Sequence, residues 1–151
     1  MGFSPAGLLI ALAVLAPNLL LIWLPPREPL PRVRVPAPLT LLERVGQALC
    51  LVVPAITLPG GFVAWWLLPA SLALAGYYAL WARYLVTGRV GASLYRSWWI
   101  LPVPMALLPV LVFLAAAAWL MNPWIAIAAG VLAIGHVPAS LVIARALGPR
   151  A

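Results

Sequence analysis

The sequence predicts an all-α membrane protein, a bundle of five transmembrane helices with the N-terminus outside and the C-terminus in the cytoplasm. Three observations predict this class. Of the 151 residues, 66% are hydrophobic and only 7% are charged, whereas a soluble domain carries about a quarter charged residues. The rarity of charge leaves long uncharged runs of the length that a bilayer requires. Nearly all the charge is arginine, and the arginines occupy a few short segments between those runs.

Turn signals divide the uncharged runs into five segments. A helix that crosses the hydrocarbon core needs about 20 residues. Pro59-Gly60-Gly61 and Asn122-Pro123 are strong turn signals within otherwise apolar sequence. Dividing the chain there predicts one transmembrane domain of residues 1–151, with helices at 4–24, 41–58, 62–87, 98–121 and 124–147. The first segment lacks the basic start and the cleavage site of a signal peptide, so we expect it to be a retained helix.

The arginines predict the orientation, because cytoplasmic loops carry an excess of Lys and Arg. With five helices every arginine falls on one side, and the turns at 59–61 and 122–123 carry none. The arginines are Arg27, Arg32, Arg34 and Arg44 after the first helix, Arg83, Arg89 and Arg96 around the end of the third, and Arg145 and Arg150 at the C-terminal end. We expect the cytoplasmic (inner) membrane of a bacterium, because the use of arginine alone and the abundance of alanine are typical of a high-GC genome.

The first cytoplasmic loop, residues 25–40, is basic and rich in proline. Proline at this spacing excludes helix and favours an extended, polyproline-like backbone. We interpret the loop as a stiff connector lying on anionic lipid headgroups; a loop that docks a partner protein is the alternative. Because topology explains the arginines, the net charge of +7 does not predict a nucleic-acid partner, and membrane lipids are the expected one.

Polar side chains of the predicted helices gather at one depth. Counting about 1.5 Å per residue from the outer turns places Gln47 and His136 roughly 20 Å from the outer surface, and Glu43 roughly 25 Å from it. Polar side chains in a membrane usually face the bundle interior or a wet cavity. We therefore predict a ligand-binding pocket in the cytoplasmic half of the bilayer, formed by Asn18, Glu43, Gln47, Tyr77, Tyr78, Trp81, His136 and Ser140.

Glu43 and His136 each have a purely structural alternative. Thr40 and Glu43 match the capping box at a helix start. Glu43 is also placed to form an ion pair with Arg83 or Arg44. His136 can hydrogen-bond a backbone carbonyl that a proline of the fourth helix leaves free.

Motifs for cofactors, metals and common catalytic mechanisms are absent from the sequence. It has no Gly-rich phosphate loop, no HExxH, no G-x-S-x-G and no CxxC. The lone His136 lacks the further ligands that a metal needs, and the single Cys50 cannot form an internal disulfide. We predict no cofactor and no metal site. The stripe of Tyr77, Trp81 and Tyr84 is typical of helix packing as well as of ligand contact.

Several segments resemble those of an uncharacterised family of small multi-pass membrane proteins of bacteria. They are APNLLLIWLPP at 16–26, LLERVGQ at 41–47, YYALWARYLVTGR at 77–89, LYRSWWILPVPMALLPVLVFLAAAAWL at 94–120 and IGHVPAS at 134–140. The resemblance covers residues 17–140 and implies no activity. It singles out the ERxGQ, YYxxWxRY and GH segments, which depth counting also places in one layer.

Three functions remain open. The first is the binding or transport of an amphipathic, lipid-like small molecule; since one short protomer offers little wall for a polar path, transport would require a homo-oligomer. The second is a non-catalytic accessory or assembly protein that uses the Gly- and Ala-rich helix faces. The third is a membrane-embedded enzyme acting on an apolar, isoprenoid-like substrate, with Glu43 as a buried acid and His136 or Tyr78 as base.

Overall fold

The computed structural model describes residues 1–28, 30, 33–98 and 100–148, and within them the chain is helical, with no strand. The first bundle helix is continuous through α1 (Pro5–Leu15), the 3₁₀ turn η1 (Ala16–Leu19) and α2 (Leu20–Trp23). The other long helices are α3 (Ala37–Ile56), α4 (Leu67–Val86), α5 (Pro104–Trp119) and α6 (Pro123–Ala146). Short 3₁₀ turns precede and follow α4, namely η2 (Ala64–Trp66) and η3 (Gly91–Leu94).

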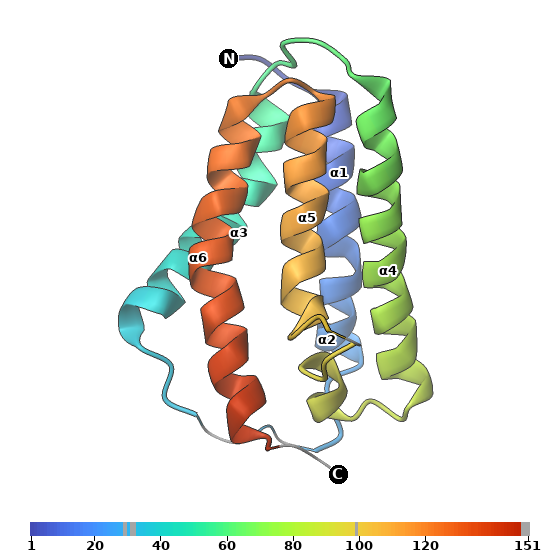
Figure 1. Ribbon diagram of the computed structural model, residues 1–151, viewed down its shortest axis with the longest axis vertical. Helices are drawn as coiled ribbons and strands as arrows, with labels where there is room; N and C mark the ends of the chain where they lie inside the picture. Colours follow the sequence, from blue (N-terminus) through green and yellow to red (C-terminus); the bar gives the residue numbers. More distant parts are fainter. Residues whose placement is uncertain (29, 31–32, 99, 149–151) are drawn as a thin grey trace.

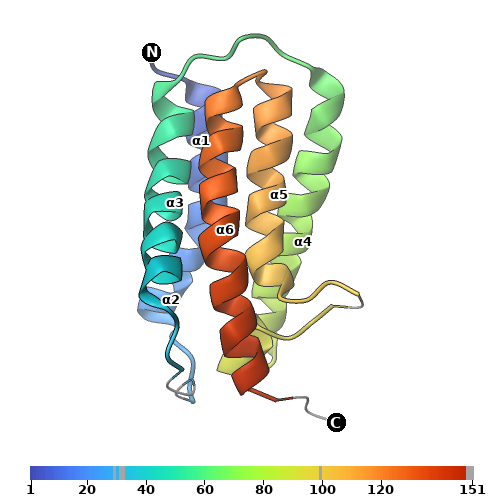
Figure 2. The ribbon, with the colours of Figure 1, turned by 60° about the vertical axis from the view of Figure 1, so that its left-hand side comes forward.

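The five helices run roughly side by side, and successive helices point in opposite directions (Figure 1). In the turned view α3, α6, α5 and α4 lie next to one another, with α1 behind them (Figure 2). The contacts agree, because α6 packs on α3 and α5, α5 packs on α4, and α1 packs on α3 and α5. The chain therefore starts at one end of the bundle, and α6 finishes at the other (Figure 1).

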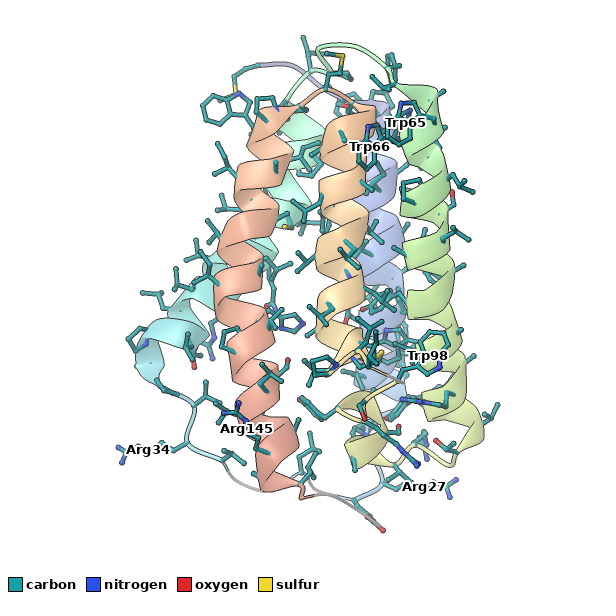
Figure 3. The ribbon with its side chains drawn as sticks, viewed as in Figure 1. Arg27, Arg34, Trp65, Trp66, Trp98 and Arg145 are labelled. Atoms are coloured by element: carbon teal, nitrogen blue, oxygen red, sulfur yellow. The ribbon has the colours of Figure 1, made fainter. Side chains whose placement is uncertain are left out.

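Three helices are long and apolar enough to cross a membrane: Pro5–Trp23, Ala37–Ile56 and Pro123–Ala146. The apolar helix α5 is shorter, and its 16 residues rise about 24 Å. Large apolar side chains such as Leu9, Leu72 and Ile134 are exposed on the outside of the bundle. Arg27, Arg34 and Arg145 lie toward one end of the bundle, whereas Trp65 and Trp66 lie toward the other (Figure 3). Arg32 and Arg150 are outside the described residues.

Prolines explain where two predicted helix boundaries differ from the structure. The fourth helix was predicted from residue 98 but begins at Pro104, because Pro102 and Pro104 disfavour helical backbone in the residues before them. Val103, between these two prolines, adopts a positive φ of 42°, and Trp98 forms an isolated bridge with Leu101. The second helix begins at Ala37 instead of 41, since Pro38 occupies its first turn, where a missing N–H costs no helical hydrogen bond.

Glycines let α1 and α6 approach α3 closely. A Cβ at Gly46 would overlap the backbone of Leu132 on α6, and one at Gly135 would overlap the backbone of Glu43 on α3. Gly7 on α1 lies equally close to the carbonyl of Pro54 on α3. Small residues at helix interfaces permit this backbone proximity in membrane proteins. As a result, side chains beside these glycines meet across the interface.

Candidate functional site

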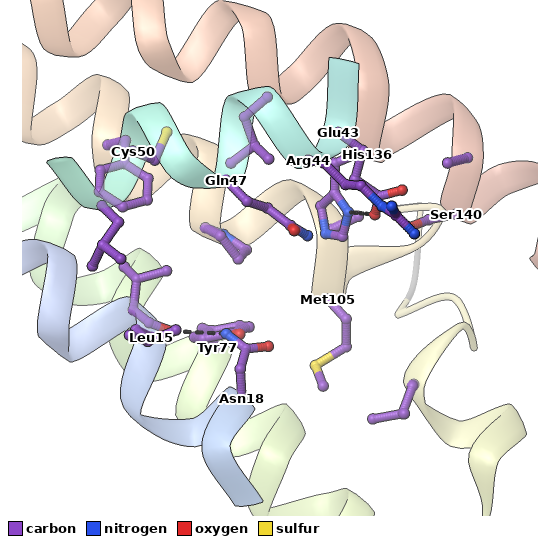
Figure 4. Close-up of a pocket in the computed structure, with 18 of the residues that line it drawn as sticks. Leu15, Asn18, Glu43, Arg44, Gln47, Cys50, Tyr77, Met105, His136 and Ser140 are labelled. Atoms are coloured by element: carbon purple, nitrogen blue, oxygen red, sulfur yellow. Dashed lines mark hydrogen bonds and ion pairs between the residues drawn. The ribbon is translucent and has the colours of Figure 1, made fainter. Parts of the chain in front are cut away.

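A cavity of about 550 Å³ lies in the interior of the bundle (Figure 4). It reaches from the middle of the helices to the segment between η3 and α5. Residues of all five bundle helices line it, and most of them are apolar. The lining comprises Ala11, Val14, Leu15, Asn18, Leu21, Glu43, Arg44, Gln47, Ala48, Cys50, Leu51, Tyr77, Trp81, Leu94, Tyr95, Met105, Ala106, Pro109, Phe113, Leu132, His136, Ala139, Ser140 and Ile143.

Glu43 and His136 form the most polar contact of the cavity wall. Nδ1 of His136 lies 2.6 Å from Oε1 of Glu43, and each side chain keeps about a quarter of its surface exposed (23% and 24%). Gly135, the residue before His136, brings the two helices close enough for this contact. Either the imidazole N–H donates to the carboxylate, or the carboxylic acid O–H donates to the ring nitrogen. In the first arrangement Nε2 is an acceptor when the imidazole is neutral and a donor when it is a charged imidazolium; in the second arrangement Nε2 is a donor.

This contact decides between the structural alternatives for Glu43 and His136. The N-cap of α3 is Pro36, so the predicted capping box is wrong; Thr40 lies within the helix, and its Oγ1 is 3.5 Å from the carbonyl of Pro36. Among the described residues neither Arg83 nor Arg44 forms an ion pair with Glu43, and Nη2 of Arg83 donates to the carbonyl of Ser93 at 3.0 Å. Glu43 and His136 instead bond to each other.

The opposite wall is aromatic. Tyr77 and Trp81 on α4 are almost fully buried (2% and 3% exposed), and their rings meet edge to face with centroids 6.3 Å apart. The indole Nε1–H of Trp81 is buried without a hydrogen-bond partner in the described part of the chain. Asn18, from the first helix, also lines this side, and its amide donates to the carbonyl of Val14 at 3.0 Å (Figure 4).

Of the eight predicted pocket residues, Tyr78 alone is not in the lining. Its hydroxyl donates to the carbonyl of Ala13 at 2.9 Å. That carbonyl lacks its usual helical partner because Pro17, four residues later, has no N–H. Tyr78 therefore satisfies a backbone acceptor that would otherwise be unpaired, and it ties α4 to α1. Asn18, Glu43, Gln47, Tyr77, Trp81, His136 and Ser140 all line the cavity.

Tyr95 is a lining residue that the sequence analysis missed. It follows η3 in a segment expected to be a plain connector, so no periodic pattern pointed to it. Burial, and secondly the negative charge of Glu43, raise the pKa of the Tyr95 phenol above its ordinary value. The phenol is consequently neutral at physiological pH and able to donate a hydrogen bond. Its position beside α5 follows from the late start of that helix at Pro104.

The described residues contain no group of three or more His, Cys, Asp and Glu side chains that could hold a metal ion. Comparison with protein-family models, with curated proteins and with solved structures finds no match. The resemblance of the ERxGQ, YYxxWxRY and GH segments to a bacterial membrane family therefore stays a prediction.

Proposed function

We propose that this chain is an inner-membrane protein of a bacterium with five transmembrane helices and its N-terminus outside. The three helices of sufficient length and hydropathy support a membrane location. We further propose that α4 and α5, which lie alongside these three helices, also cross the membrane (Figure 2). Arginines at one end of the bundle (Figure 3) agree with a cytoplasmic position of that end.

Within this membrane protein we propose a binding site for an amphipathic, lipid-like small molecule in the central cavity. The observation that carries the proposal is a mostly apolar cavity of about 550 Å³ with polar groups on two of its walls. Sites for small organic ligands have volumes of about 300–1,000 Å³ and the same combination of apolar lining and few polar groups. Glu43 and His136 would bind a polar part of the ligand, and Tyr77 and Trp81 would pack on its apolar part. Transport of such a molecule would additionally require an oligomer.

Native mass spectrometry of gently solubilised protein, with extraction of co-purifying lipids, tests this function. We expect a specific adduct in the wild type that is lost in Glu43→Gln and in His136→Ala, because the first change removes the carboxyl group and the second removes the imidazole that the polar part of the ligand would contact. Glu28→Gln is the matched control, since Glu28 is the other acidic residue, is exposed and does not line the cavity. Adducts that persist equally in all variants would reject the central cavity as the binding site.

An acid–base enzyme acting on an apolar substrate is the second candidate, and the contact between Glu43 and His136 favours it. A carboxyl group on Nδ1 orients the imidazole and determines which ring nitrogen carries the proton, as in many catalytic dyads. Nε2 could then exchange a proton with a substrate in the cavity. On this hypothesis Glu43→Gln abolishes turnover of an isoprenoid-like substrate without lowering the unfolding temperature. Turnover retained in that variant would exclude the enzyme.

A further inference from the structure

A second, larger hollow lies at the arginine-bearing end of the bundle, and we name it the basic cavity. Its volume is about 920 Å³. It is bounded by the end of α4, residues 87–97 and 102–103 between α4 and α5, and the last turns of α6. Its lining is Arg83, Thr87, Val90, Ala92, Ser93, Tyr95, Arg96, Ser97, Pro102, Val103, Leu141, Ala144, Arg145, Leu147 and Gly148.

Three arginines from three different elements line this cavity: Arg83 from α4, Arg96 from the segment before α5, and Arg145 from α6. No carboxylate lines it within the described residues. Like charges gathered in one hollow repel each other, and an anion that binds between them would remove this repulsion. Arginine is also the side chain whose planar fork best matches the oxygens of phosphate and carboxylate groups.

Arg83 is partly built into the fold. One of its terminal nitrogens, Nη2, donates to the carbonyl of Ser93 at 3.0 Å. Its Nε is buried without a hydrogen-bond partner in the described part of the chain. The bond to Ser93 fixes the guanidinium at the cavity wall and leaves other donors unused. Such a pre-positioned, incompletely satisfied cation is suited to bind a ligand with several acceptor oxygens.

Tyr95 belongs to the walls of both cavities, so the two cavities lie on either side of this side chain. An elongated molecule that extends past Tyr95 would have its apolar part in the central cavity and its charged end among the arginines. Basic hollows between helices at the cytoplasmic side of a membrane are typical binding sites for lipid phosphate groups. We propose that the basic cavity binds a phosphate group, through Arg83, Arg96 and Arg145, and that this group is the head of the amphiphile in the central cavity.

This inference rests on the proposed function, since it assigns the head group of the same ligand. The phosphate could belong to a phosphorylated lipid or be free in solution. Binding of three probes to the full chain in neutral detergent micelles separates the cases: dioleoyl phosphatidic acid, dioleoylglycerol and inorganic pyrophosphate. The variants are Arg83→Gln and Arg145→Gln. Arg34→Gln is the matched control, because Arg34 is exposed toward the same end (Figure 3) and does not line the basic cavity.

We expect phosphatidic acid to bind the wild type at least tenfold more tightly than dioleoylglycerol. Arg83→Gln and Arg145→Gln should each lower the affinity for phosphatidic acid by about tenfold, the usual effect of losing a charge-assisted hydrogen bond. Dioleoylglycerol binding should stay unchanged in these variants, and Arg34→Gln should bind like the wild type. Unfolding temperatures of Arg83→Gln and Arg145→Gln within a few degrees of the wild type would show that loss of binding is not loss of fold.

The other outcomes overturn one proposal or both. Equal binding of the two lipids by the wild type would reject the phosphate site and leave the lipid-binding function standing. If Arg34→Gln lowered the affinity for phosphatidic acid as much as Arg83→Gln, the site would also be rejected. Unspecific attraction of the lipid by the basic end of the bundle would then explain the binding. Binding of pyrophosphate alone, sensitive to Arg83→Gln, would keep the phosphate site and reject the lipid. Binding of no probe would reject both.

Discussion

At the scale of single residues, Gly135 determines how closely α6 approaches α3 at the site. An added Cβ would overlap the backbone of Leu42 and Glu43, which cannot move aside as a flexible side chain would. We expect Gly135→Ala to destabilise the protein by about 1–3 kcal/mol, the usual cost of overpacking. The shift would also separate Glu43 from His136. Thermal unfolding in detergent measures the first effect, and the lipid adduct in native mass spectrometry reports the second.

Gly130→Ala is the matched control for this prediction. Gly130 lies on the same helix, and a Cβ there would meet nothing within 4 Å. Replacing a glycine inside a helix by alanine stabilises it by about 0.5–1 kcal/mol where there is space. The two substitutions should therefore shift the unfolding temperature in opposite directions. A stabilising effect of Gly135→Ala would mean that α3 and α6 are not in backbone contact at Glu43.

Most residues of the site could be predicted from the sequence, because depth in a helical bundle follows from the number of residues after a turn. That count placed His136 roughly 20 Å and Glu43 roughly 25 Å from the outer surface, and in the structure the two side chains are in contact. The count does not specify toward which neighbouring helix a side chain points. It therefore could not distinguish Tyr78, whose hydroxyl bonds to α1, from Tyr77, which lines the cavity. Nor could it find Tyr95, whose place depends on where α5 begins. Contacts made by loops were therefore missed.

At the scale of elements, Asn122 joins α3 to α6 at the end opposite the arginines. Its Oδ1 accepts from the backbone N–H of Trp124 at 3.1 Å and caps α6. Its Nδ2 donates to Oγ1 of Thr57, just after α3, at 2.8 Å. Asn122→Ala removes both bonds, and we expect a loss of about 2 kcal/mol in unfolding free energy, about half of it from the cap. Unfolding in detergent measures it.

Thr57→Val leaves the cap of α6 intact and removes the Oγ1 acceptor of Asn122, together with the hydrogen bond that this Oγ1 donates to the carbonyl of Val53 at 2.7 Å. The double variant of Asn122→Ala and Thr57→Val should cost less than the sum of the two single changes, since both remove the same hydrogen bond between the two side chains. Strict additivity would show that the two side chains are not coupled.

Element boundaries were predictable where a turn signal stands alone and less so where prolines cluster. Asn122-Pro123 begins α6 within a residue of the expected position, because a capping side chain and an N-terminal proline favour the same start. Prolines at 102 and 104 were expected inside a helix, but together they delay its start to Pro104. Pro38 was expected to lie in the loop and instead lies in the first turn of α3. The same residue type therefore starts, delays or interrupts a helix according to its distance from the helix end.

At the scale of the whole molecule, the five crossings that we propose would place the turn near Phe62 on one side of the membrane and the segments at Arg34 and Ser97 on the other, because α3 and α4 would each cross once. All three residues are exposed. Cys50 is the sole cysteine and is buried, so a Cys50→Ala background allows single cysteines to be labelled with a membrane-impermeant maleimide. We expect Phe62→Cys to react in intact cells, and Arg34→Cys and Ser97→Cys to react only after permeabilisation.

The labelling pattern also decides which compartment the basic cavity faces, because Ser97 lines that cavity. Protection of both Arg34→Cys and Ser97→Cys in intact cells would place the arginines on the cytoplasmic side, where anionic lipid headgroups attract them. The reverse pattern would contradict the orientation and direct the cavity outward. Opposite reactivity of Arg34→Cys and Ser97→Cys would mean that α3 and α4 do not both cross, and the central cavity could not then lie within the bilayer. The orientation of the whole chain thus determines from which side a phosphorylated ligand can enter.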